Sequence, residues 1–449
     1  MRRIQYVLWA TLLIPVVLWL AAEPTAWTTQ GVFPLRKNMV QLTGAVAIAA
    51  MSVTVILASR PLWCQSWLGG LDKMYRLHKW LGISAVTMGV AHWLWYKGPK
   101  WLAEMGLLVR PKHGRRGDVD GFLANLLLEM RDFAKDVGEI AFYVAVALLV
   151  VALLRKIPYW AFSKVHKAFP VVYLGLVLHS VVLLRTGYWM TPLGIVLGAL
   201  MAYGSWAAIA VLLGFAGKNR KAKGKITSLN YNPVARSLEI ETEMTGWGGH
   251  KAGQFAFAAS GAFEGAHPYT IASAWDKGSR RLAFVVKELG DHTSKLREKL
   301  AVGQTLSIEG PYGCFTFDDK RPRQVWVAGG IGMTPFIGRL EQLAMDRKAG
   351  KTAGQKPVDM YLCIPKDDPE TTGPLERLAR DAGVNLRVMV DSRDGFFTAA
   401  RLREETPQWQ EASVWFCGPA LFGKALRGDL KKAGFPVGRH FHQELFEMR

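Results

Sequence analysis

Six long apolar stretches fill the first half of the 449-residue chain, and they constrain its fold more than any other feature. Each is close to the roughly 20 residues that a helix needs to cross about 30 Å of hydrocarbon. We therefore predict six membrane-spanning helices, at Tyr6–Ala22, Met39–Ser59, Leu77–Tyr96, Val137–Lys156, Val165–Leu184 and Pro192–Phe215. Arg2 and Arg3 are also typical of a signal peptide, but Ala21–Pro24 is a poor cleavage site and five spans follow, so we expect a retained helix.

The character of the sequence changes after Phe215. Gly217–Lys225 is a basic linker of the kind found at the cytoplasmic face of membranes, and no later stretch is long enough to span a bilayer. An even number of spans places both ends on one side, so we predict a cell (inner) membrane protein with cytoplasmic termini. The basic Arg155–Lys167 connection agrees. The long basic segment Lys97–Lys135 falls on the outer side, but long loops follow the charge rule poorly.

Composition narrows the function classes further. The chain is 50% hydrophobic and only 20% charged, which excludes a disordered, collagenous or coiled-coil protein. Its four cysteines form no C-x-x-C pair, which argues against a disulfide framework, a zinc ribbon and c-type haem attachment. A membrane surface explains the net charge of +20 better than nucleic acid does, because many Lys and Arg flank the apolar stretches.

Four histidines lie inside the predicted spans and form two depth-matched pairs. His78 and His92 are in the third span, and His166 and His179 are in the fifth. We place His78 and His166 second in their helices near the inner face, with His92 and His179 further out. Imidazole is the usual axial ligand of haem iron, and an ionisable group inside a bilayer needs a partner. The pattern predicts two haem b groups, each held by one His from each helix. Histidines of a polar network are the alternative.

Helical spacing supports one pair better than the other. Fourteen residues separate His78 from His92, about 40° short of four full turns, so both point to nearly one face about 21 Å apart. Thirteen residues separate His166 from His179, about 140° short of four turns, which aims the rings apart on an ideal helix. Pro170 lies between them, so we predict that the fifth span is distorted there.

The segment beyond the linker carries two candidate flavin-binding elements. His267, Pro268, Tyr269 and Thr270 follow a strand-like segment; Tyr269 is suited to stack on a flavin ring and the Thr270 hydroxyl to hydrogen-bond its reactive edge. Thr293 and Ser294 begin a predicted helix, whose free N–H groups bind phosphate. An ordinary strand and ordinary helix capping are the alternatives.

A second set of motifs indicates a nucleotide site. The apolar strand Val325–Ala328 leads into a glycine turn and then a helix expected from Phe336, an arrangement that lets the backbone approach a pyrophosphate. The residues of this turn proposed to bind the cofactor are Gly329, Gly330, Gly332, Thr334 and Pro335. Strands are expected at Val358–Ile364, Asn385–Val390 and Val414–Phe416, the last ending in Cys417, Gly418 and Pro419. Lys366 is placed to bind the 2′-phosphate of NADPH, although a solvent-facing Lys is the alternative and NADH stays open.

Five motifs follow one another along the chain: the histidine spacings, the H-P-Y-T strand, G-P-Y-G at 310–313, G-G-I-G-M-T-P and C-G-P. Together and in this order, they resemble the NADPH oxidase/ferric reductase transmembrane superfamily. The resemblance implies a six-helix haem domain (1–217), an antiparallel FAD-binding β-barrel (218–318) and an α/β NAD(P)H domain with a parallel sheet (319–449). It further implies that Cys417 lies beside the nicotinamide, that FAD occupies the barrel and that Phe446 shields the flavin. Thr270 and Cys417 are then the candidate catalytic residues.

The resemblance also shapes the expected function. Cytoplasmic NAD(P)H would deliver electrons through FAD and two haems to an outer acceptor, either oxygen, giving superoxide, or a ferric chelate. Eukaryotic oxidases of the family keep an Arg in helix two and a His one turn beyond the outer ligand. Here no Arg occurs between Lys37 and Arg60, and Tyr96 takes the second place, which weakens the oxidase expectation. For the haem propionates, the expected cations are Arg76, Lys79 or Lys167 at the inner haem and Lys97 or Arg185 at the outer.

Three alternatives remain open from sequence. One is a reductase that serves a quinone or a periplasmic partner protein. Another is a flavin reductase for soluble acceptors, in which the haems are only structural. The third, from a different class, is a nucleotide-sensing membrane transporter or scaffold whose histidines relay protons.

Overall fold

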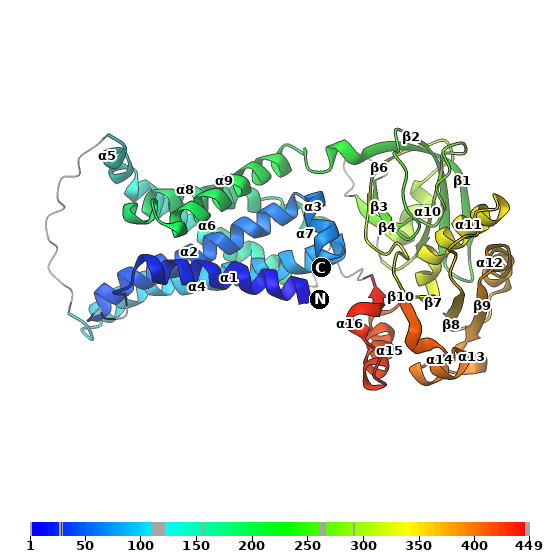
Figure 1. The fold of residues 1–449 in the computed structure, drawn as a ribbon. Coiled ribbons are helices and arrows are strands. Elements are labelled where there is room, and N and C mark those ends of the chain that lie inside the picture. Colours follow the sequence, from blue (N-terminus) through cyan, green and yellow to red (C-terminus); the bar gives the residue numbers. More distant parts are fainter. Residues whose placement is uncertain are drawn as a thin grey trace. The chain divides into compact units, whose positions relative to one another are not determined.

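The computed structural model describes residues 2–26, 28, 30–109, 122–154, 157, 159–259, 266–290 and 292–444, and all structural statements concern these residues. The chain divides into two compact units, Met1–Leu68 with Lys73–Ala216, and Gly69–Asp72 with Gly217–Arg449. Each unit is described by itself. The first is helical, and the second contains two β-sheets with flanking helices (Figure 1).

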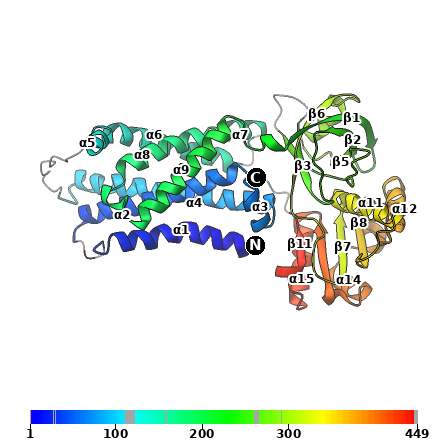
Figure 2. The ribbon, with the colours of Figure 1, turned by 45° about the horizontal axis from the view of Figure 1, so that its top comes forward.

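Long helices lie side by side in the first unit (Figures 1 and 2). They and their short neighbours are α1 (Arg2–Ala22), α2 (Val32–Ala58), α3 (Leu62–Leu68), α4 (Leu71–Glu104), α5 (Phe122–Glu129), α6 (Arg131–Leu153), α7 (Tyr159–His166), α8 (Phe169–Leu183), the 3-10 turn η1 (Thr186–Tyr188) and α9 (Pro192–Leu212). Helix α2 packs on α9, and α6 packs on α8.

Five helical segments of the described chain are long and apolar enough to cross a membrane, and these match five of the six predicted spans. The remaining predicted span is α4, which has 34 residues, more than enough to cross a bilayer. Charged residues crowd both of its ends, but Trp80–Tyr96 between them contains no Asp, Glu, Lys or Arg. A helix of this kind has an apolar centre and solvated ends, as expected for a span that extends beyond the hydrocarbon.

The helices differ from the predicted spans mainly at their ends. Helix α4 begins at Leu71, so His78 is its eighth residue, not its second, and His166 is the last residue of α7. The expected position of these two histidines at helix starts was therefore wrong. Apolar runs mark only the part of a helix inside hydrocarbon, while the polar turns before it stay helical in water. Residues 110–121 of the basic Lys97–Lys135 segment lie outside the described residues.

The predicted distortion of the fifth span is confirmed. It consists of two helices, α7 and α8, interrupted at Lys167 and Ala168, directly before Pro170. A proline has no N–H to donate, and its ring clashes with the carbonyl four residues earlier, here that of His166. The break therefore lies between the two histidines of this span and lets their rings point in independent directions.

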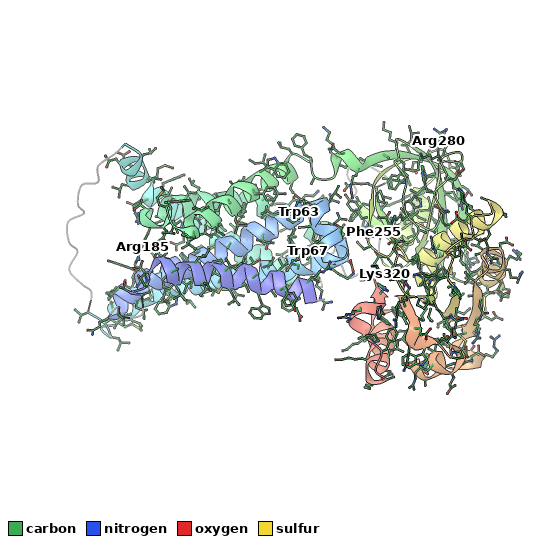
Figure 3. All side chains as sticks on the ribbon, in the orientation of Figure 1. Trp63, Trp67, Arg185, Phe255, Arg280 and Lys320 are labelled. Atoms are coloured by element: carbon green, nitrogen blue, oxygen red, sulfur yellow. The ribbon has the colours of Figure 1, made fainter. Side chains whose placement is uncertain are left out.

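Contacts between distant residues define the two ends of the helical unit. Arg185, after α8, forms an ion pair with Glu23, after α1, so these connections share one end. Arg3 at the start of α1 donates to the Trp67 carbonyl of α3, at the other end. Figure 3 labels Arg185 and Trp67 at opposite ends of this unit. Since α9 leads away from the Arg185 end, the chain leaves the unit at the end where α1 begins, as the even number of spans predicts.

The first sheet of the second unit is antiparallel and closes on itself. Its order is β4 (His267–Thr270), β3 (Phe255–Ala259), β6 (Thr305–Tyr312), β1 (Lys221–Asn232), β2 (Ser237–Thr245) and β5 (Arg281–Lys287). Ile271, directly after β4, pairs with Phe284 of β5, so the two outer strands meet. Ile226, Ile308 and Phe284 pack inside. This is the predicted antiparallel barrel.

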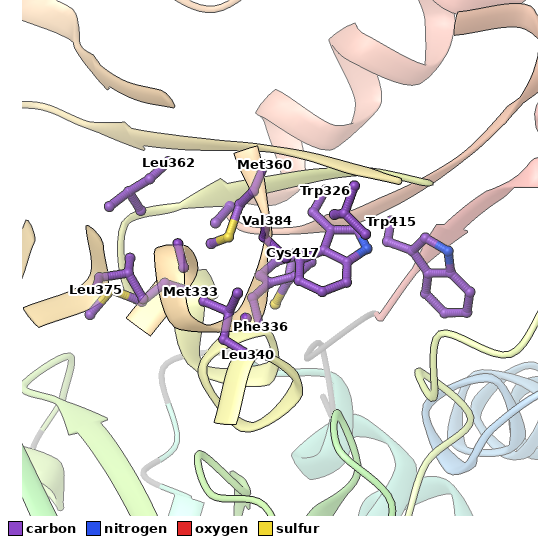
Figure 4. Packing of buried hydrophobic residues seen from close by; sticks show 14 of the residues in the cluster. Trp326, Met333, Phe336, Leu340, Met360, Leu362, Leu375, Val384, Trp415 and Cys417 are labelled. Carbon is purple, nitrogen blue, oxygen red and sulfur yellow. The ribbon is translucent and has the colours of Figure 1, made fainter. Parts of the chain in front are cut away.

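The second sheet is parallel, in the order β11 (Phe441–Gln443), β10 (Ala412–Cys417), β7 (Arg323–Gly329), β8 (Val358–Ile364) and β9 (Asn385–Val390). Helices α11 (Thr334–Lys348) and α12 (Pro369–Ala382) cover one face, and α14 (Ala399–Glu405) and α15 (Ala420–Lys432) the other. Figure 4 shows the first of these cores, with Trp326, Phe336 and Leu340. Within this sheet, the chain passes from central β7 to β8 and β9 and then crosses back to β10, on the other side of β7. The direction of winding therefore reverses between β7 and β10, and ligands of such sheets bind at this point.

A buried carboxylate holds the start of β7 in place. Asp319 accepts hydrogen bonds from Ser413 (2.8 Å), Gln324 (2.6 Å) and Lys356 (3.0 Å). Burial alone would raise the pKa of Asp319, but these donors hold it below its ordinary value. The ionised carboxylate therefore connects β10, β7 and the segment before β8.

We predict that Asp319→Asn lowers the stability of the second unit by about 2 kcal/mol, because an amide cannot accept from every donor and leaves buried groups unpaired. Thermal unfolding of the full chain, followed by tryptophan fluorescence, measures the change. Asp318→Asn is the matched control, since the Asp318 side chain is 67% exposed and is paired with exposed Lys251 and half-buried Thr316. Equal stability of the two variants would show that the Asp319 contacts contribute nothing.

Candidate functional site

The four histidines of the helical unit form two facing pairs. The ring centres of His78 and His166 are 5.9 Å apart, and those of His92 and His179 are 6.1 Å apart. A metal ion about 2.0 Å from each ring nitrogen, with each ring centre about 1.2 Å behind, would separate two ring centres by about 6.4 Å, within about 0.5 Å of both pairs. Both pairs therefore leave room for one metal ion between the rings. The pairing is the one predicted; the ligand role stays a prediction.

Backbone carbonyls orient three of the four rings. The Nδ1 atoms of His78, His92 and His179 lie 2.9, 2.9 and 2.8 Å from the carbonyl oxygens of Thr54, Val40 and Ala134. A carbonyl only accepts, so each Nδ1 carries the proton and each Nε2 presents a lone pair. Metal-bound histidines make this second contact in nearly every known site, because it fixes both the tautomer and the ring orientation.

Two helical glycines give the outer rings access to these carbonyls. Gly44 lies four residues after Val40, and Gly138 four residues after Ala134, so each glycine donates to the same carbonyl within its helix. A Cβ at Gly44 would come within 3.1 Å of the His92 ring, and one at Gly138 would overlap Nδ1 of His179. Sequence analysis missed both glycines, since a helical glycine has no distinctive pattern.

His166 is held differently. Its Nδ1 is buried and has no hydrogen-bond partner among the described residues, while the rings of Phe162 and Phe169 lie 5.1 and 4.9 Å away. Aromatic packing at the end of α7 thus replaces the carbonyl contact. The difference follows from the break at Lys167–Ala168, which places this ring at a helix end.

A cavity of about 250 Å³ surrounds the outer pair. Its walls include His92, His179, both glycines, and apolar residues of α2, α4, α6, α8 and α9. Arg131 and Lys135, at the start of α6, also line it and are the cations that a carboxylate inside would meet. The predicted partners for this role, Lys97 and Arg185, do not line the cavity and are paired with Glu139 and Glu23, while Lys135 is itself paired with Asp132. Arg131 and Lys135 were missed because they precede the apolar run of their helix.

The predicted flavin strand exists as β4, and its residues are arranged on the barrel. Thr270 is buried, and the Tyr269 ring packs 6.0 Å from Phe284. His267 stacks on His292, with ring centres 3.7 Å apart, so the start of β4 lies beside the segment that contains Thr293. The predicted helix here is only a 3-10 turn, η3 (Thr293–Lys295), followed by one helical turn, α10 (Leu296–Lys299). The Thr293 hydroxyl closes the turn by accepting from the Leu289 and Gly290 amides.

The glycine turn after β7 and the C-G-P turn after β10 lie in close contact. A Cβ at Gly332 would overlap the Cys417 carbonyl, and one at Gly329 would come within 2.8 Å of Pro419. Glycine at these positions lets two backbone segments meet at the point where the sheet reverses its winding. A short 3-10 turn, η4 (Gly330–Met333), follows Gly329, and α11 then begins at Thr334, two residues before the predicted start.

Cys417, Lys366 and Phe446 are three further predicted site residues. Cys417 is buried, and burial together with Glu444 raises the pKa of its thiol, so the thiol stays neutral. Lys366 is exposed just after β8, and its role in binding the 2′-phosphate stays a prediction. Phe446 lies outside the described residues. Glu444 was missed: it is buried near Cys417 and Gly313, but a single Glu beyond the last strand has no motif.

Two family models match the chain. Residues 43–177 match "Ferric reductase like transmembrane component", and residues 242–316 match "FAD-binding domain". Among curated proteins, the glycine betaine monooxygenase reductase subunit of Chromohalobacter salexigens is 27% identical over 195 residues, covering 40% of this chain and 50% of the relative. Ferric reduction oxidase 2 of Arabidopsis thaliana is 36% identical over 83 residues, covering 17% of this chain and 11% of that protein. The chain spans about half the length, or less, of the curated relatives it matches.

Two solved structures are similar to parts of the chain. The Amycolatopsis cytochrome P450 reductase GcoB has a TM-score of 0.42 at 20% identity, covering 51% of this chain and 70% of that one. The flavohemoglobin of Malassezia yamatoensis has a TM-score of 0.46 at 17% identity, covering 92% and 98%. The two family models thus match a ferric-reductase-like transmembrane component within the helical unit and an FAD-binding domain within the barrel.

We predict that Gly332→Ala slows the reduction of bound flavin by NAD(P)H at least 10-fold, while FAD stays bound. The added methyl group overlaps the Cys417 carbonyl and separates the two turns of the predicted nucleotide site, whereas the barrel is untouched. Stopped-flow absorbance of the flavin measures the rate, and released FAD measures retention. Gly428→Ala in α15 is the control, since nothing lies within 4 Å of its Cβ position. Unchanged reduction in Gly332→Ala would remove these turns from the nucleotide site.

Proposed function

We propose that this chain, which has the domain architecture of the NADPH oxidase/ferric reductase superfamily, carries electrons from cytoplasmic NAD(P)H through FAD and two b-type haems to an acceptor across the cell membrane. The proposal rests on the two facing imidazole pairs, whose ring centres are 5.9 and 6.1 Å apart. Two such couples on the same two spans provide two relay positions at different depths.

The helical unit supplies ligands and orientation. His78 with His166, and His92 with His179, would each hold one haem iron through Nε2, since three of the four rings direct Nδ1 to a carbonyl. Arg131 and Lys135 would pair with the carboxylates of the outer haem inside its cavity. When bound, FAD accepts two electrons together and releases them singly, and the haems carry one electron at a time.

The second unit supplies the site for the electron donor. Thr270 and Tyr269 would hold the flavin ring, with Thr293, Ser294, His267 and Pro268 near its phosphates. The turns at Gly329–Thr334 and Cys417–Pro419 would bind the nucleotide. A neutral thiol at Cys417 does not compete as a nucleophile, so its role is contact with the nicotinamide. Lys366 favours NADPH over NADH through its charge.

The direction of transfer rests on the basic linker after α9. Along the chain, Lys218 and Arg220 follow α9 in a short 3-10 turn and Lys221 begins β1, and basic residues directly after the last span favour a cytoplasmic position for that end. An inside-negative potential then assists outward transfer by about 2.3 kcal/mol per 100 mV for a full crossing.

The acceptor is oxygen or a ferric chelate. One sequence argument against oxygen is corrected by the structure: α2 begins at Val32 and therefore contains Arg36, which donates two hydrogen bonds to the Tyr96 carbonyl (3.1 and 3.0 Å). Helix two thus does contain an Arg, one turn beyond the outer pair. A quinone or a periplasmic partner is the second candidate acceptor. A proton-relaying transporter fits less well, because three of the four rings are fixed by backbone carbonyls, and a proton relay requires rings that can turn.

Haem content tests the proposal directly. The purified full chain should contain two b-type haems per chain, and anaerobic NADPH should produce the spectrum of reduced b-type haem. A colourless protein, or haem that NADPH leaves oxidised, would refute the transmembrane relay. Two haems that stay oxidised while a soluble dye is reduced would favour a flavin reductase with structural haems.

We predict that His92→Leu lowers the haem content from two to one per chain and abolishes reduction of an outer acceptor, while dye reduction by NADPH persists. Gly138→Ala should weaken the same centre without removing a ligand, because its methyl group displaces the His179 ring. Gly98→Ala is the control, as nothing lies within 4 Å of its Cβ position. Pyridine haemochrome absorbance measures the content. Both haems retained in His92→Leu would exclude His92 as a ligand.

A further inference from the structure

A half-buried ion-pair network connects the antiparallel barrel with helix α11. Arg281, at the start of β5, donates to Glu241 of β2 at 2.7 and 2.5 Å. The same guanidinium donates to both carboxylate oxygens of Glu341, on α11, at 3.1 and 3.2 Å. These three side chains are 36%, 27% and 24% exposed. We call them the Arg281 bridge.

Arg281 holds together like charges on the two sides of this contact. Burial alone would lower its pKa, but Glu341 and Glu241 raise the pKa above its ordinary value. Glu239, a third carboxylate on β2, lies near enough that burial, Glu241 and Glu341 all raise its pKa. Without the guanidinium, carboxylates of the barrel would face a carboxylate of α11 and repel it.

The carboxylate of Glu341 also holds the main chain that follows β4. The Ala274 amide donates to this carboxylate at 2.9 Å. The segment Ile271–Ala274 is buried and follows directly after Thr270. The two amides at its start donate to carbonyls of the barrel at 3.0 and 2.8 Å. The barrel therefore fixes the start of this segment, and α11 fixes its end.

A glycine brings the backbone of α11 onto the same segment. Gly338 lies three residues before Glu341, so both face one side of the helix. A Cβ at Gly338 would come within 3.0 Å of the Ser273 carbonyl oxygen and 3.3 Å of that of Ile271. Both distances are shorter than an ordinary van der Waals contact. A side chain at this position would therefore push the helix away from the barrel, whereas the Arg281 bridge draws it in.

This contact lies on a short path between the two predicted cofactor sites. Figure 2 shows α11 beside the barrel. The helix begins at Thr334, directly after the predicted nucleotide turn, and Glu341 is seven residues, about 10 Å, further along it. On the barrel side, Ala274 lies four residues after Thr270, which is predicted to meet the reactive edge of the flavin. The position of α11 on the barrel therefore sets the position of the turn relative to β4.

Stability alone accounts less well for the arrangement. Partly exposed ion pairs contribute little to stability. The neighbouring pair of Arg280 and Glu243 is of that kind, with side chains 52% and 50% exposed on the barrel surface. The Arg281 bridge differs because it crosses to a helix, includes a main-chain amide and coincides with the close approach at Gly338. These features restrict a position as well as adding attraction.

We propose that Arg281, Glu341 and Gly338 are positioning residues that set the distance between the nicotinamide and the flavin. This inference rests on the proposed function and specifies how its first step is controlled. In that step a hydride passes from NAD(P)H, which becomes NAD(P)⁺, to bound FAD, which is thereby reduced. Reacting atoms must approach to about 3–3.5 Å, and a displacement of about 1 Å can slow such a step about 100-fold. The three residues act through the nucleotide turn and β4, without touching either cofactor.

The kinetic test separates nucleotide binding from hydride transfer. The full chain in nanodiscs is mixed anaerobically with NADPH, and flavin absorbance gives the limiting rate and the apparent Kd. Arg281→Gln and Glu341→Gln should each lower the limiting rate about 3- to 10-fold, while the Kd changes less than 2-fold. With NADPH deuterated at the transferred position, the isotope effect should stay at least as large as in the unaltered chain. A raised Kd at an unchanged limiting rate would overturn the proposal, and so would a lost isotope effect.

Further variants, compared at equal FAD content, distinguish position from charge and from misfolding. Arg280→Gln removes a neighbouring cation and should change the limiting rate less than 2-fold. Gly338→Ala leaves every charge in place and favours the helix, yet it should slow the limiting rate at least 3-fold. Gly428→Ala is its control, since nothing lies within 4 Å of its Cβ position. The double variant Arg281→Gln/Glu341→Gln should be no slower than the slower single variant, because both break one contact. Multiplied losses, or equal effects of Arg280→Gln and Arg281→Gln, would contradict the positioning role.

Hydrogen exchange tests the contact without electron transfer. In the full chain, Glu341→Ala removes the acceptor of the Ala274 amide, whose exchange should become at least 10-fold faster. The Ala272 amide keeps its partner in the barrel and should exchange as before. If Glu341→Ala slows flavin reduction without faster exchange at Ala274, or if both amides exchange faster together, the proposal is wrong. If NADPH leaves the flavin of the unaltered chain oxidised, the proposed function fails and the positioning role with it, while faster exchange at Ala274 would still establish the contact.

Discussion

The contact between an imidazole Nδ1 and a helix carbonyl is the interaction on which the helical unit depends. A histidine inside a bilayer is unfavourable unless both of its nitrogens have partners. His78, His92 and His179 satisfy one nitrogen on a neighbouring helix, and each of these helices is different from the one that carries the ring. The contacts thus fix the ring directions and also the height of α4 relative to α2 and of α8 relative to α6. The residues that would bind the cofactors are the same residues that set the packing.

Much of this arrangement could be predicted from the sequence. Apolar length located the membrane spans, and short apolar runs located β8 and β9, because hydrophobic burial determines both patterns. Depth and spacing paired the histidines correctly, and Pro170 indicated the break that allows the second pair to form. These predictions succeeded because each depended on local chemistry that repeats in the sequence.

Other features depend on contacts between distant segments, and the sequence pattern contains no trace of them. Helix ends were misplaced because polar turns of α4 remain helical outside the apolar stretch. Gly138 and Arg36 have meaning only once α6 lies beside His179 and α2 lies beside Tyr96. Glu444 approaches Cys417 only because β11 pairs beside β10 in the parallel sheet. Such relations follow from tertiary packing, which no single-sequence periodicity describes.

The interruption at Lys167–Ala168 has a consequence for the tuning of electron transfer. In a continuous helix, any rotation that adjusted one ligand would turn the other by the same angle. With two helical pieces, His166 can respond to changes around Phe162 while His179 keeps its carbonyl on α6. The midpoint potentials of two successive centres can then evolve separately, so the step between them can be made downhill by substitutions that affect only one.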